Sequence, residues 1–227
     1  MTSLWQQSNY ALLQHQIKIG DVIAFGGNSL FSRWAKLTTQ SVVTHLAIVI
    51  ESSPHPDVPN GVLHKIIEAT SYKGRSGVMI NHLCERSNSY AGNMWWLPLS
   101  EESRQIFTQN QTSCLEFLLQ QQNKPYDIWQ LFGSAVDATD NLPLFKYLSN
   151  NTEDFTRWFC SELVAAALRL SKLVHIDNAS EITPIDICRY AIFHTTYTQF
   201  VGEQTEIAGF NTLPPPCNDK PTHIKTP

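Results

Sequence analysis

The chain has 227 residues, of which 42% are hydrophobic and 16% are charged, and its formal net charge is −4. This length and hydrophobic content are enough to bury a full core in one domain. The slightly acidic balance, without a long basic cluster, gives no electrostatic basis for nucleic-acid binding. The sequence contains no run of about 18 uncharged apolar residues, so we expect no membrane-spanning helix.

The N-terminal segment, residues 1–16, is polar and rich in glutamine. It has neither the basic start nor the continuous apolar stretch of a secretory signal. We therefore expect a helical or irregular extension in front of the main domain, and a cytoplasmic protein.

A four- or five-stranded antiparallel sheet is predicted in the first hundred residues. Short runs of β-branched and apolar residues alternate there with clusters of turn formers, which is typical of strands joined by hairpins. A turn at Gly20 and Asp21 precedes the first of these runs. The predicted strands cover residues 22–25, 45–50, 62–69, 78–82 and 93–97, and a helix is predicted over 30–37.

The second half of the chain predicts helices. Residues 101–122 form a long helical pattern that begins near Ser100, with two acids in the first turn, where the helix dipole favours negative charge. Residues 128–157 read as an irregular insertion, rich in aromatic side chains at its start, that covers a cleft. An alanine-rich helix follows, then a short helix over 184–190 and a proline-rich, flexible tail over 213–227.

Cys160 is the candidate nucleophile. After it, apolar residues recur at Leu163, Val164, Ala167 and Leu168, the spacing of one buried helical face. This pattern predicts that Cys160 lies in the first turn of the helix. Unpaired backbone N–H groups and the positive end of the dipole would there favour the thiolate.

His45 and Glu68 are the candidate partners of that thiol. His45 opens a short apolar strand, and Glu68 ends the next one, so an antiparallel hairpin with a long loop would bring them together. We expect the register in which His45 lies opposite Glu68 and Ile50 opposite Leu63. A slip of one residue would turn Glu68 to the other face of the sheet.

Each of these three residues also has an ordinary structural explanation. A cysteine taken alone is most often a small buried core residue, and a histidine is most often a hydrogen-bonded structural one. A glutamate at a strand end is most often solvated. The three residues therefore indicate a catalytic site only as a set, through the order in which they occur along the chain.

The five cysteines predict reduced thiols. They lie at positions 84, 114, 160, 188 and 217, far apart and without a CxxC pair, and their number is odd. Cys84 and His82 do not have the ligand spacing of a common structural zinc site. We expect no metal and no cofactor.

Five short motifs recur in an order that is typical of one enzyme family. The motifs are Gly20–Ile23, Thr44–Val49, Ile67–Ala69, Pro125–Asp127 and Trp158–Val164, and they extend from residue 20 to about residue 170. In this order the chain resembles the circularly permuted branch of the NlpC-type papain-like cysteine hydrolases, in particular the YiiX-like proteins. The histidine precedes the cysteine here, as it does in that branch.

The resemblance implies an α+β, circularly permuted papain-like fold, an antiparallel sheet or small barrel packed against helices, over residues 17–212. It implies Cys160 as nucleophile, His45 as base and Glu68 as the group that orients the imidazole. Tyr126 matches a tyrosine beside the family's site and is expected to help bind substrate. The implied function is that of a thiol protease or amidase that cleaves an amide or ester through a thioester acyl-enzyme.

Two alternatives stay open at this point. The first is an acyltransferase that acts on lipid-type acyl groups, and the second is a non-catalytic binding module that keeps the cleft. The expected partner is a peptide, an amino-acid amide or an acyl-lipid substrate, and the sequence does not specify which. It also gives no indication of oligomeric state.

Overall fold

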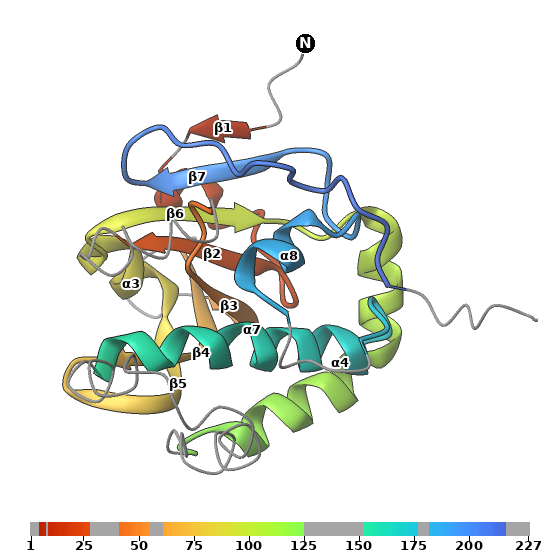
Figure 1. Ribbon diagram of the computed structural model, residues 1–227, viewed down its shortest axis with the longest axis horizontal. Coiled ribbons are helices and arrows are strands. Elements are labelled where there is room, and N and C mark those ends of the chain that lie inside the picture. The colour runs from red at the N-terminus through yellow and green to blue at the C-terminus, as the bar shows by residue number, and fades with distance from the viewer. Residues whose placement is uncertain are drawn as a thin grey trace, which may run out of the picture.

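The computed structural model describes residues 5–7, 9–27, 41–54, 61–124, 152–176 and 182–216. These residues form one mixed sheet with helices packed against it (Figure 1). The strand order is β1-β7-β6-β2-β3-β4-β5, in which β1 runs parallel to β7 and the other neighbours are antiparallel. The helix predicted over 30–37 lies outside the described residues.

All five predicted strands are confirmed, and the sheet extends beyond them. The N-terminal segment, expected to be helical or irregular, contributes an edge strand as well as a short helix. The second addition comes from residues 197–201, for which we predicted no strand. The strands are β1 (Trp5–Gln7), β2 (Val22–Gly27), β3 (His45–Pro54), β4 (Val62–Tyr72), β5 (Arg75–His82), β6 (Gly92–Leu97) and β7 (Tyr197–Val201).

The connection between β4 and β5 is shorter than the predicted loop over 72–77. Lys73 and Gly74 both have positive φ angles, 50° and 73°, and they form a two-residue turn. Such turns match the right-handed twist of the strands that they join. Strand β5 therefore begins at Arg75, and its far end leads directly into a short helix that we did not predict.

Helices cover both faces of the sheet. The long predicted helix is confirmed, with the Ser100 side chain accepting a hydrogen bond from the Ser103 N–H at 3.1 Å. The short helix near residue 184 is confirmed as well. The described helices are α1 (Tyr10–Leu13), α3 (Leu83–Ser89), α4 (Glu101–Gln121), α7 (Thr152–Leu170) and α8 (Pro184–Arg189).

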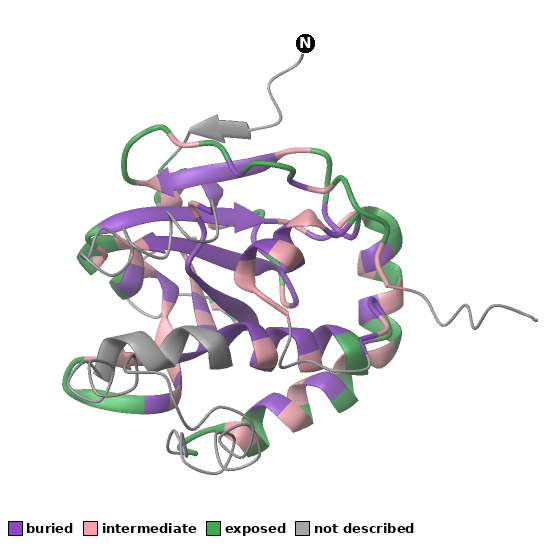
Figure 2. Ribbon diagram, in the orientation of Figure 1, coloured by how far each residue is buried: buried purple, intermediate pink, exposed green. Residues whose placement is uncertain are grey.

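The core has two layers because the central strands are buried on both faces (Figure 2). Side chains alternate between the faces along a strand. Leu46 and Ile48 of β3 pack in the layer that contains α4, α7 and α8. Ala47 and Val49 pack in the layer that contains α1 and α3. A central strand of this kind reads as a continuous apolar run.

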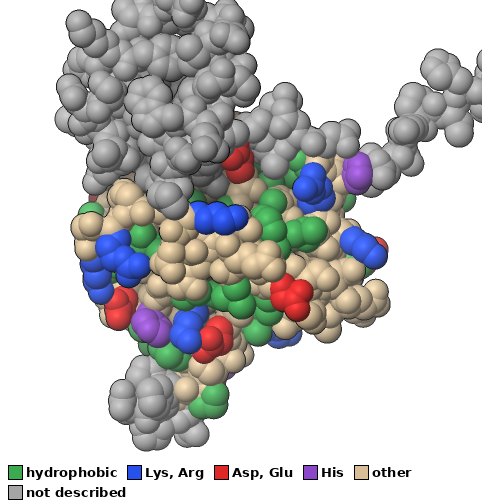
Figure 3. Space-filling model, turned by 90° about the horizontal axis from the view of Figure 1, so that it is seen from below, with side chains coloured by type: hydrophobic (Ala, Val, Ile, Leu, Met, Phe, Trp, Pro, Cys, Tyr) green, Lys and Arg blue, Asp and Glu red, His purple; other side chains and the backbone are tan. Residues whose placement is uncertain are grey.

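The surface drawn in Figure 3 is mixed in character. Basic and acidic side chains lie among polar atoms and small groups of hydrophobic side chains. Across the part of the chain that the structure describes, no helix combines the length and apolar character needed to cross a membrane.

Candidate active site

His45 and Glu68 meet across the β3–β4 ladder. His45 is the first residue of β3, and its Nε2 lies 2.7 Å from Oε2 of Glu68. Glu68 lies opposite Ala47 on the neighbouring strand. Its side chain reaches diagonally to the residue two positions away on the same face. Both side chains are buried, Glu68 completely.

The predicted register was wrong, by two residues at Glu68 and by three at Leu63. Glu68 was expected opposite His45, and Leu63 opposite Ile50, but Leu63 lies opposite Ser53. An irregularity between Val49 and Glu51 shifts the pairing along the rest of the hairpin. Because side chains have a period of two, a shift by two residues keeps Glu68 on the face of His45.

Cys160 reaches the same histidine from the helical layer. It is a fully buried residue of α7, and this helix packs against β3 and β4. Burial by itself would lower the pKa of His45, but the charge of Cys160 and a hydrogen bond to it, together with Glu68, raise that pKa to about 9. The structure thus brings together all three predicted catalytic side chains, from two strands and one helix.

The predicted position of Cys160 in its helix was wrong. We expected it in the first turn, but α7 begins at Thr152, so about two turns precede the cysteine. Backbone N–H groups in a helix interior are bonded to the carbonyl groups four residues earlier. The helix start therefore supplies neither a dipole for the thiolate nor N–H groups for an oxyanion at Cys160.

Four hydrogen bonds satisfy the carboxylate of Glu68. Oε1 accepts from Asn81 Nδ2 at 2.8 Å and from Arg86 Nε at 2.8 Å, and Oε2 accepts from Arg86 Nη2 at 3.1 Å besides facing His45. Burial would raise the pKa of Glu68, but the hydrogen bond and charge of His45, with Arg86 and Asn81, outweigh it and lower the pKa. The carboxylate is held in its ionised form.

Sequence reasoning missed Arg86. It lies on α3, is itself buried, and its guanidinium carbon is 4.4 Å from the ring centroid of Tyr72, 5.3 Å from that of Phe25 and 5.5 Å from that of Tyr90. The ring of Phe25 also lies 5.0 Å from the ring of His45. No spacing in the sequence points to Arg86, because its partner is eighteen residues earlier on a strand of the hairpin.

The other predicted site residue, Tyr126, lies outside the described residues. So do residues 128–151 of the predicted insertion and the last part of the predicted tail, 217–227. The end of that insertion, residues 152–157, was expected to be irregular but belongs to the helix α7. Among the described residues, no group of three or more histidine, cysteine, aspartate or glutamate side chains has the arrangement of a metal site.

The other described cysteines differ from Cys160. Burial raises the pKa of the Cys114 thiol to about 12, and burial also raises the pKa of the Cys188 thiol. Cys84 is half-buried. No histidine contributes to the pKa shift of Cys114 or of Cys188, so these two buried thiols serve as comparisons for Cys160.

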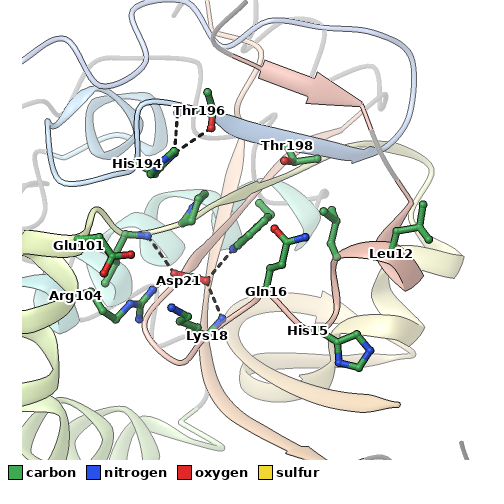
Figure 4. A pocket seen from close by; sticks show the side chains of 14 residues that line it. Leu12, His15, Gln16, Lys18, Asp21, Glu101, Arg104, His194, Thr196 and Thr198 are labelled. Carbon is green, nitrogen blue, oxygen red and sulfur yellow. Dashed lines mark hydrogen bonds and ion pairs between the residues drawn. The ribbon is translucent and has the colours of Figure 1, made fainter. Parts of the chain in front are cut away.

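A cavity of about 620 Å³ lies on another part of the molecule, next to α1 and the start of α4 (Figure 4). Neither Cys160, His45 nor Glu68 lines it. Its walls combine polar side chains with a few apolar ones: Leu12, Leu13, His15, Gln16, Lys18, Asp21, Trp96, Pro98, Leu99, Glu101, Arg104, His194, Thr196 and Thr198.

Asp21 is the fully buried carboxylate in the wall of this cavity. It accepts hydrogen bonds from Lys18 N and Trp96 Nε1, both at 2.8 Å, from Leu99 N at 3.1 Å, and from Arg104. These donors come from the turn before β2, from β6 and the residues after it, and from α4. Asp21 therefore ties three elements together.

No family model and no curated protein matches this sequence. The functional conclusion therefore depends on the geometry around His45 and on the motifs that the sequence analysis identified.

Proposed function

We propose that the protein is a cysteine hydrolase of the circularly permuted papain-like class, which cleaves an amide or ester bond through a thioester acyl-enzyme. One observation carries the proposal: the buried imidazole of His45 lies 2.7 Å from Glu68 and interacts with Cys160. A nucleophile, a base and a group that orients the base form the constellation needed for acyl transfer. The packing of the cysteine helix on the antiparallel strand that carries the histidine supports the fold assignment.

The roles follow from the contacts. In this mechanism Glu68 accepts a hydrogen bond from the Nε2–H of His45, so the other ring nitrogen, Nδ1, serves the thiol of Cys160. His45 takes the proton from Sγ, and Sγ attacks the carbonyl carbon of the substrate. The imidazolium then gives that proton to the leaving amine or alcohol, and a thioester remains on Cys160.

Water completes the reaction. His45 accepts a proton from the water as its oxygen attacks the thioester. The carbon–sulfur bond then breaks, the imidazolium returns the proton to Sγ of Cys160, and the acid leaves. In an acyl transfer, an amine or alcohol takes the place of this water. Peptides, amino-acid amides and acyl lipids are the substrate classes that suit this chemistry. The family resemblance gives Tyr126 a role in binding the substrate.

Acyl-enzyme formation tests the proposal directly. The protein is incubated with a small activated ester, quenched in acid, digested and analysed by mass spectrometry. We expect the acyl group on the peptide that contains Cys160, and its loss after hydroxylamine treatment. The variants Cys160→Ser and His45→Ala should not form this adduct. Acylation spread over other cysteines or lysines, or adducts that persist in His45→Ala, would contradict the proposal.

Alkylation by iodoacetamide distinguishes the enzyme from a binding module. Cys160 should react faster at neutral pH than Cys114 and Cys188, because it interacts with His45 whereas burial raises the pKa of the other two thiols. Replacing His45 by alanine should remove this advantage. Fast, His45-dependent alkylation without any acyl-enzyme would indicate a module that keeps the site but has lost turnover.

A further inference from the structure

We propose that Arg86 is a positioning residue of this site, which acts through Glu68 by fixing the orientation and the charge of the carboxylate that faces His45. The inference rests on the proposed function. It adds a fourth residue, from the helix α3, to a reaction centre otherwise drawn from β3, β4 and α7.

The hydrogen bonds show how Arg86 would orient Glu68. Its Nε and Nη2 atoms donate to the two carboxylate oxygens separately, at 2.8 and 3.1 Å, which is the bidentate pairing typical of arginine with a carboxylate. A carboxylate held at both oxygens cannot rotate about its last bond. Oε2 therefore stays directed at Nε2 of His45, and the imidazole keeps Nδ1 available for Cys160.

The charge of Arg86 is needed because Glu68 is completely buried. An isolated buried carboxylate becomes protonated instead of staying charged. Among the described residues, the charged groups that act on Glu68 are His45 on β3 and Arg86 on α3. The neutral Asn81 on β5 also donates to it, and Cys160 on α7 acts on His45. Of these groups, only Arg86 carries a charge that does not change during the reaction or over the working pH range.

The surroundings of Arg86 favour arginine over lysine. Three aromatic rings, those of Tyr72, Phe25 and Tyr90, lie around the guanidinium. A planar guanidinium stacks on such rings and offers two parallel N–H groups, whereas an ammonium group is a single, strongly hydrated point charge. These surroundings therefore fit a guanidinium with two parallel N–H donors better than an ammonium group.

The test is the pH dependence of iodoacetamide alkylation at Cys160, measured by mass spectrometry on the full chain. In Arg86→Gln we expect the pKa of Glu68 to rise, so that the acidic limb of the rate profile moves up by about one pH unit or more. The rate at alkaline pH should be kept. Arg86→Lys keeps the charge but loses the fork, and should give a smaller shift in the same direction; it also serves if the glutamine variant fails to fold.

Arg104→Gln is the matched control, because Arg104 also pairs with a buried carboxylate, Asp21, in a cluster away from the site. It should lower thermal stability and leave the midpoint of the profile in place. The double variant Glu68→Gln/Arg86→Gln should show no further shift than Glu68→Gln alone. An unmoved midpoint in Arg86→Gln and Arg86→Lys, or an added shift in the double variant, would overturn the inference.

A failure of the proposed function looks different in the same assay. If His45→Ala leaves the alkylation profile of the parent protein unchanged, the thiol does not depend on the imidazole, and both proposals fall. If His45→Ala abolishes the fast reaction but both Arg86 variants behave as the parent does, only the role of Arg86 is wrong.

Discussion

In the part of the chain that the structure describes, two fully buried carboxylates are each paired with an arginine, and their other partners differ. Asp21 accepts hydrogen bonds from two backbone N–H groups, an indole and Arg104, all of which belong to the framework. Glu68 accepts hydrogen bonds from Asn81 and Arg86 and faces His45, which also interacts with the thiol of Cys160. The first carboxylate joins elements of the framework, and in the proposed mechanism the second orients a side chain that can move a proton.

The two pKa shifts express this difference. Burial dominates at Asp21 and raises its pKa, although Arg104, Lys18, Trp96 and Leu99 act against it. At Glu68 the hydrogen bond and charge of His45, with Arg86, overcome burial and lower the pKa. A buried carboxylate with an arginine is therefore no sign of function by itself. What sets Glu68 apart is its titratable partner His45, which in turn interacts with the proposed nucleophile Cys160.

The largest expected effect on stability comes from Asp21→Ala. It leaves the Arg104 guanidinium, the Trp96 indole and two backbone N–H groups without their acceptor. Breaking a buried pair of this kind costs about 3–5 kcal/mol in the free energy of unfolding. Urea denaturation measures this loss. Cys160 alkylation in the folded fraction should be unchanged, and a slower reaction there would show that the two clusters are coupled.

A smaller effect, of a different kind, is expected from Glu68→Gln. The substitution keeps the shape but removes the charged hydrogen bond to His45, worth about 1.5–3 kcal/mol. Alkylation of Cys160 at neutral pH should slow by about 10- to 100-fold. The rate is measured by quenching the alkylation at a series of times and quantifying the labelled peptide by mass spectrometry. Asp21→Asn serves as the control. Equal rates in Glu68→Gln and the parent would remove the distinction between the two carboxylates.

The smallest effect is expected from Ser100→Ala at the start of α4, which lies next to the Asp21 cluster. The serine side chain caps the Ser103 N–H at 3.1 Å. Its loss should cost about 1 kcal/mol in the free energy of unfolding. The alkylation rate of Cys160 should not change. A change in that rate would mean that the framework around α4 transmits its strain to the site.

The sequence predicted much of the sheet and the convergence of the three side chains. The apolar runs that begin at His45 and Val62 are buried strands, so their β-branched composition was a sufficient signal. The exact register was not predictable, because the irregularity between Val49 and Glu51 leaves no mark in an apolar run. Because side chains alternate between the two faces of a strand, the two-residue shift kept Glu68 on the same face as His45.

The errors elsewhere have two causes, an incomplete local signal and long-range contacts. We placed the start of the cysteine helix from its apolar face alone, although Thr152, Glu153 and Asp154 form a reasonable helix start by themselves. Strands β1 and β7 were missed because they pair with each other across most of the chain length. Arg86 was missed because a long-range contact, and not a local pattern, gives it a role.

The pKa of the His45 imidazole tests the central claim most directly, by NMR titration of the parent protein and of Cys160→Ser. A pKa raised from 6.5 to about 9 implies a stabilising contribution that is full below pH 6.5 and is lost as the pH rises through about 9. The coupled site predicts a value near 9 in the parent and a fall of about one unit or more in the variant, where only Glu68 still raises it. A value near 6.5 in both proteins would contradict the coupling of Cys160, His45 and Glu68.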